Sequence, residues 1–126
     1  MKNLEGAPKF VGKYFNCENC GLKSLEGTLD HIGTILFCGE NDLSSLKGAP
    51  SNVLYIHAPD KYVSDLLGTP ADLSNKRLNL SKNHLKTLKG TLKRVGELNV
   101  SKQMSGKSFT EDDAIRAGIT VDTFKG

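Results

Sequence analysis

The most regular feature of this sequence is a pair of hydrophobic residues, two positions apart, that returns every 20 to 22 residues. Side chains two positions apart lie on the same face of a β-strand. We therefore expect five short strands, each too small to bury its apolar side without the next. The pairs are Phe15/Cys17, Leu36/Cys38, Ile56/Ala58, Leu78/Leu80 and Leu98/Val100, and an apolar anchor precedes each pair at Val11, Ile32, Val53, Leu73 and Val95.

The clearest repeat, residues 78–88, reads L-x-L-x-x-N-x-L-x-x-L and resembles the unit of a leucine-rich repeat. Asn83 in this unit is suited to bonding the backbone of a neighbouring coil. The equivalent positions of the other coils hold Cys20, Asn41, Lys61 and Gln103. A glycine recurs after each repeat, and we expect it to close the coil with a positive φ.

These patterns predict a leucine-rich repeat solenoid over residues 1–104, of α/β class but rich in β-structure. It should have about five coils, with a parallel β-sheet on a concave face. Residues 105–126 should form a C-terminal cap, in which a short helix starts after Thr110 and stops at Gly118. The apolar residues available to the cap are Phe109, Ile115, Ile119, Val121 and Phe124. The N-terminal edge lacks a comparable segment, so we expect it to be a candidate for self-association or for binding.

The residue pattern of the first two repeats is also informative. Residues 4–17 read Leu-x-Gly-Ala-Pro-x-x-Val-Gly-x-x-Phe-x-Cys, and residues 25–38 keep half of this phrase. The chain is similar to the short leucine-rich repeat proteins encoded by large-genome tailed bacteriophages. This resemblance implies a solenoid without enzymatic activity that binds a host or viral protein in the host cytoplasm. Modulation of a host enzyme or defence system would then be its role.

Strand alternation predicts which side chains face outward from the sheet. Aromatic and aliphatic residues gather at these positions in the first three coils, and an exposed patch of this kind favours protein binding. The alternative is that aromatic residues here merely raise strand propensity. The predicted partner-binding residues are Tyr14, Asn16, Ile35, Phe37, Tyr55, His57, Arg77 and Asn79.

The net charge of +3 is unevenly distributed, because residues 71–107 carry nine Lys or Arg against Asp72 and Glu97. A basic patch of Lys82, Lys86, Lys93, Arg94 and Lys102 gives an alternative function, the binding of nucleic acid or of an acidic partner. A structural or homo-oligomeric role is a third possibility.

Residues Gly106-Lys107-Ser108 resemble the ending of a phosphate-binding loop. The first glycine that such a loop needs would be residue 101, which is Ser101, so the motif is incomplete.

The cysteines add little chemistry. Cys17 and Cys20 have C-x-x-C spacing, but Cys17 and Cys38 align with core positions, which favours reduced structural thiols over a metal site or redox work. Three cysteines without a disulfide framework, and no apolar run long enough for a membrane span, predict a cytoplasmic protein. The three histidines and the carboxylates form no catalytic pattern, so we expect neither an enzyme nor a cofactor.

Overall fold

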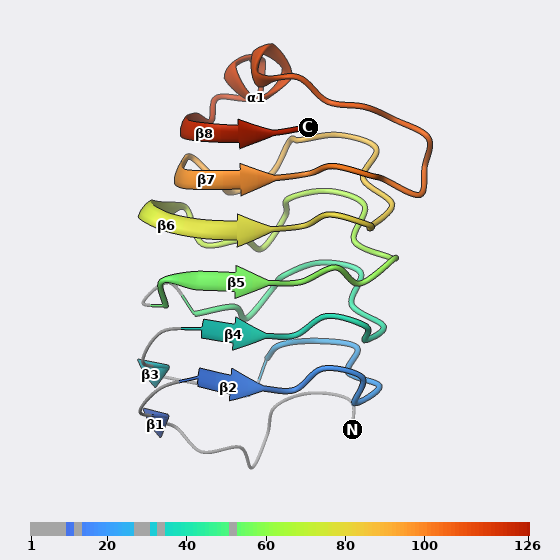
Figure 1. The fold of residues 1–126 in the computed structure, drawn as a ribbon, viewed down its shortest axis with the longest axis vertical. Coiled ribbons are helices and arrows are strands. Elements are labelled where there is room, and N and C mark those ends of the chain that lie inside the picture. Colours follow the sequence, from blue (N-terminus) through green and yellow to red (C-terminus); the bar gives the residue numbers. More distant parts are fainter. Residues whose placement is uncertain (1–9, 12–13, 27–30, 33–34, 51–52) are drawn as a thin grey trace.

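The structure is a computed structural model that describes residues 10–11, 14–26, 31–32, 35–50 and 53–126. These residues form a solenoid of about five turns, and its coils stack into one six-stranded parallel sheet of order β2-β4-β5-β6-β7-β8 (Figure 1). The predicted solenoid fold is confirmed. Its elements are β1 (Phe10–Val11), β2 (Tyr14–Asn16), β3 (His31–Ile32), β4 (Ile35–Phe37), β5 (Tyr55–His57), β6 (Asp72–Asn79), β7 (Arg94–Asn99), α1 (Glu111–Arg116) and β8 (Thr120–Lys125).

The strands pair in the register that the sequence repeat predicts. Equivalent residues of successive strands are direct neighbours, and they form a row that runs from Phe15 through Leu36, Ile56 and Leu78 to Leu98. The last four of these side chains are buried, as are the second members of all five pairs. Because these rows stack at the spacing of neighbouring strands, the core is one continuous column.

The one long spacing in the repeat, 22 residues from Ile56 to Leu78, has a local cause in β6. Leu73 pairs with Val95 and Arg77 pairs with Glu97, so β6 holds two more residues than β7 between these two pairs. The extra residues form a bulge in which Asn75 has a φ of 61°. The bulge keeps both apolar positions in register despite the insertion.

The recurring glycines are explained more by close packing of coils than by backbone conformation. Gly48 and Gly68 have φ values of 93° and 83°, as expected, but Gly90 has no positive φ, so the expectation was wrong there. A Cβ on Gly90 would lie 2.1 Å from the carbonyl carbon of Leu66 in the coil below. Successive coils can approach this closely only where one of them has no side chain.

Replacing Gly90 with Ala is therefore expected to lower the free energy of unfolding by at least about 2 kcal/mol, because two coil backbones must separate. Gly106→Ala is the control, since its φ of 80° is strained for Ala but no atom lies within 4 Å. It should lose only about 1 kcal/mol. Urea unfolding of both variants would measure the difference, and equal losses would contradict the packing explanation.

Amide side chains connect the coils beside the core. Asn83 Nδ2 donates to the carbonyl oxygens of Ala58 and Leu80, and its Oδ1 accepts the N–H groups of Asp60 and Val63. Asn41 and Gln103 make the corresponding bonds, each to its own coil and to the coil before it. All three amide side chains are buried. This polar ladder, which we define as Asn41, Asp60, Asn83 and Gln103, satisfies backbone groups that a coil cannot pair internally.

In the third coil the structure corrects the sequence prediction. The predicted ladder residue Lys61 is exposed with a φ of 86°, and the buried position belongs to Asp60. Asp60 follows Ala58 by two residues, whereas Asn83 follows Leu80 by three, although the next buried residue, Val63 or Leu85, comes five residues on in both coils. Asp60 Oδ1 accepts the N–H of Leu43 at 3.2 Å, but its Oδ2 is buried without a partner. Burial raises the pKa of this carboxyl to about 7.

The C-terminal segment contains the predicted helix and an unpredicted strand. Thr110 caps α1 through a capping box with Asp113, and Gly118 follows the helix with a φ of 83°. Residues 120–125 do not merely cover the last coil: they form β8 and extend the parallel sheet beside β7 (Figure 1). Ile115 is 59% exposed, so its expected burial in the cap was wrong.

Two expectations fall partly outside the described residues. The N-terminal edge is described only at β1, and the turn glycines at 6 and 27 are not described. The six residues of α1 are the only helix in the described chain, and no helix there has the length and apolar character needed to cross a bilayer.

Candidate functional site

The outer face of the sheet, which points away from the core, carries two rows of side chains. Every predicted partner-binding residue lies in one of them, because parallel pairing places equivalent residues side by side. The first row is Tyr14, Ile35, Tyr55, Arg77, Glu97 and Thr123, and the second is Asn16, Phe37, His57, Asn79, Asn99 and Lys125.

Four rings form a continuous group across β2, β4 and β5, which we call the aromatic cluster: Tyr14, Phe37, Tyr55 and His57. Ring centroids are 6.0 Å apart for Tyr14 and Phe37, 5.9 Å for Phe37 and His57, and 5.7 Å for His57 and Tyr55. All three contacts are edge-to-face, a favourable geometry for aromatic pairs. Tyr14 is 57% exposed and the other three rings are half-buried, so the cluster is ordered by its own packing and is still open to solvent.

Hydrogen bonds determine how His57 presents its ring. Asn79 Oδ1 accepts the N–H of Ser81 at 2.9 Å, so Asn79 Nδ2 is the atom that faces Tyr55 and His57. The hydroxyl of Tyr55 lies 2.9 Å from His57 Nδ1 and accepts from Asn79 Nδ2. Both neighbours can donate to Nδ1, which favours the neutral tautomer with its hydrogen on Nε2. Nε2–H is then a donor for a partner.

Charged side chains continue the outer face beyond the aromatic cluster. The guanidinium carbon of Arg77 lies 4.3 Å from the centroid of the Tyr55 ring, a cation–π geometry. Glu97 links Arg77 at 4.0 Å and Lys125 at 3.8 Å. Arg77 was among the predicted binding residues, but Glu97 and Lys125 were not. Lys125 lies on β8, a strand that was not predicted, and the contacts of Glu97 depend on pairing across coils.

The predicted basic residues do not form one patch. Lys82 and Lys102 follow the ends of their strands, whereas Lys93 and Arg94 precede and open β7 at the other end of the sheet. Lys86 lies in a return segment, where its N–H donates to Ser64 O. Lys82 and Lys102 instead belong to a corner column with one positive-φ residue per coil, Asn19, Glu40, Lys61, Lys82 and Lys102.

Cys17 and Cys38 lie in the core where the repeat placed them, but Cys20, which the repeat placed at the ladder position, is exposed. All three are free thiols. Burial raises the pKa of Cys17 to about 12 and that of Cys38 well above its usual range, so both stay protonated and unreactive. In the described part of the chain, no three His, Cys, Asp or Glu side chains gather in a way that could hold a metal ion.

The outer face can therefore offer rigid aromatic surface, a few fixed donors and a charged border. Comparison of the chain with protein-family models, curated proteins and solved structures gave no significant match.

Proposed function

We propose that the protein is a non-enzymatic binding module that holds a protein partner on the outer face of its sheet. The observation that supports this most directly is the aromatic cluster. Large rings contribute strongly at the centres of protein interfaces, and rings already packed edge-to-face lose little freedom on binding. A solenoid usually places binding residues on such a repeated surface, with one strand per coil.

The partner that fits this face has an apolar segment over Tyr14 and Phe37, and an acceptor such as a carbonyl or carboxylate near His57 and Arg77. The resemblance of the first repeats to phage proteins extends the proposal to a phage-encoded protein that acts on a host protein in the cytoplasm. An acidic partner or nucleic acid is the second candidate, and the stacked lysines of the corner column favour it.

The double variant Phe37→Ala/Tyr55→Ala tests the proposal in a pull-down from lysate followed by mass spectrometry. For every partner that the parent chain captures specifically, we expect the variant to capture about one tenth of the amount or less, because two central rings are lost. Tyr14→Ala, which removes a mostly exposed ring, should weaken capture in the same direction without affecting folding.

The matched control is Tyr62→Ala/Leu67→Ala. These side chains are 56% and 57% exposed and lie outside the sheet, so the control removes similar apolar surface elsewhere. Melting temperatures would confirm that the variants are folded. If the outer-face variants and the control retain the same partners as the parent chain, the outer face is not the binding site.

A further inference from the structure

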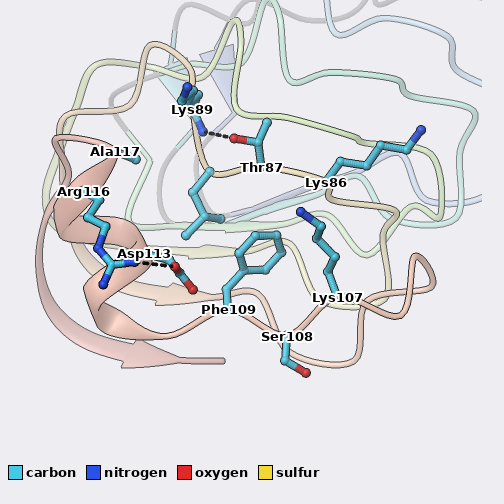
Figure 2. Close-up of a pocket in the computed structure, with 10 residues that line it drawn as sticks. Lys86, Thr87, Lys89, Lys107, Ser108, Phe109, Asp113, Arg116 and Ala117 are labelled. Carbon is cyan, nitrogen blue, oxygen red and sulfur yellow. Dashed lines mark hydrogen bonds and ion pairs between the residues drawn. The ribbon is translucent and has the colours of Figure 1, made fainter.

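A separate candidate site lies between the fourth coil and the C-terminal helix. A cleft of about 450 Å³ is lined by residues 86–89 of the return segment and by residues 107–109, 113, 116 and 117. Figure 2 shows Phe109 in the middle of this cleft, with Lys86 and Lys107 on one side and Asp113 and Arg116 on the other. The volume is in the range of small-molecule sites. No part of the outer face of the sheet contributes to it.

The cleft carries an unbalanced positive charge. Its lining contains Lys86, Lys89, Lys107 and Arg116 against one carboxylate, Asp113. That carboxylate is already occupied, since it accepts the N–H of Thr110 at 2.8 Å and pairs with Arg116 at 3.8 Å. None of the ion pairs in the described residues includes the three lysines. A bound anion would balance this positive charge.

Backbone hydrogen bonds hold these lysines on fixed segments. Ser105 Oγ donates to Leu85 O at 2.7 Å and accepts the N–H of Lys107, which attaches the segment before the helix to the fourth coil. The return segment is itself fixed, because the N–H of Lys86 donates to Ser64 O and Lys89 O accepts from Leu66 in the coil below. The return segment and the segment before the helix are thus held beside each other, so Lys86, Lys89 and Lys107 border one cleft before any ligand arrives.

The other lining groups indicate the size and type of ligand. Leu88 and Phe109 are 3% and 9% exposed and form an apolar floor, and the hydroxyls of Thr87 and Ser108 lie at the edge. We propose that this cleft binds a small phosphorylated molecule, with its phosphate between Lys86, Lys89 and Lys107 and its organic part over Phe109. Three ammonium groups match a doubly charged phosphate better than a single carboxylate.

This site does not work as a phosphate-binding loop. The N–H of Gly106 donates to Gln103 O, and α1 begins only at Glu111, so no cradle of backbone N–H groups precedes a helix. Recognition would come from side chains alone. This distinction predicts that binding depends on the lysines of the fourth coil as much as on Lys107.

The test uses pyrophosphate and adenosine monophosphate as probes, titrated into the intact chain by calorimetry and by amide chemical shifts. Saturable binding with one site should shift the amides of residues 86–89 and 107–117. Lys86→Ala/Lys107→Ala should weaken the affinity by about tenfold or more, because two charge-assisted bonds are lost. Both side chains are exposed, so the variant should keep the parent melting temperature.

The control Lys61→Ala/Lys102→Ala removes the same charge from the corner column and should change affinity less than about twofold. Equal losses in the two variants, or no saturable shift in the cleft, would overturn the proposal. A third arm titrates a single-stranded oligonucleotide. Tighter binding of the strand than of either small probe, lost equally in both variants, would also overturn it and indicate a general polyanion surface instead.

Discussion

Replacing Asp60 with Asn is expected to stabilise the protein by about 2 to 4 kcal/mol at pH 8 and by less than about 1 kcal/mol at pH 4. The buried carboxyl has one oxygen that accepts the N–H of Leu43 and a second without a partner. In the adjacent ladder residues Asn41 and Asn83, the atom equivalent to this second oxygen is an amide nitrogen that donates to a carbonyl oxygen. The variant should therefore complete the polar ladder and remove a charge that burial disfavours.

The pH dependence follows from the pKa of Asp60, which burial raises from 3.8 to about 7. Below pH 3.8 the carboxyl is neutral in both folded and unfolded chains, and its contribution to stability is greatest. As pH rises from 3.8 to about 7, the unfolded chain ionises first and stability falls, and above this range the loss is constant. The Asp60→Asn variant has no ionisable group at this position, so its stability should not show this fall with pH.

Urea unfolding at several pH values would measure both curves. Asp65→Asn is the matched control, since Asp65 Oδ1 accepts the N–H of Leu67 at the surface and an amide oxygen can keep that bond. It should change stability by less than about 0.5 kcal/mol at any pH. A stabilisation by Asp60→Asn that is the same at pH 4 and pH 8 would show that burial does not raise the pKa of this carboxyl.

Asn83→Ala is expected to destabilise the protein by about 4 kcal/mol or more. The substitution leaves the buried N–H groups of Asp60 and Val63 and the carbonyl of Ala58 without their present partner, whereas the carbonyl of Leu80 keeps its bond from Gln103 Nε2. Each unsatisfied buried group costs about 1 to 3 kcal/mol, and the lost bonds connect the third and fourth coils. Thermal unfolding should show a large fall in melting temperature, since the stack depends on contacts between neighbours.

Asn79→Ala provides the comparison for this prediction. Asn79 is also an asparagine of the same repeat, but it lies on the outer face and is only half-buried. Its loss should lower stability by less than about 1 kcal/mol, because water can replace its bonds to Ser81 and Tyr55. Similar melting temperatures for the two variants would mean that the ladder contributes little.

The candidate binding face was predictable from the sequence because strand alternation and a constant repeat length together determine which residues are neighbours. Tyr14, Phe37, Tyr55 and His57 all lie on the outer face as expected. Their order of contact was not predictable, since the Tyr14 ring packs edge-to-face on Phe37, which lies diagonally from it across the strand pair. The tautomer of His57 depends further on Asn79, which a strand pattern cannot orient.

The cleft beside α1 was beyond sequence reasoning for a different reason. Lys86 and Lys107 are separated by a full coil, and nothing in the spacing indicates that Ser105 will bond Leu85 and bring them to one cleft. The basic residues of the sequence were instead grouped by their closeness in the chain. In a solenoid, however, residues close in sequence point to different sides of a coil.

The sequence by itself determined the solenoid, the register of its first five strands, the buried thiols and the start of the helix after Thr110. These features depend on local patterns that each coil repeats, and a repeated pattern can be satisfied only by stacking. Tertiary structure alone decided that Asp60 replaces Lys61 in the ladder, because the local path of the backbone, with Lys61 at a φ of 86°, determines which side chain faces inward. It also decided that residues 120–125 continue the sheet, since the edge of β7 offers unpaired backbone groups that the segment satisfies.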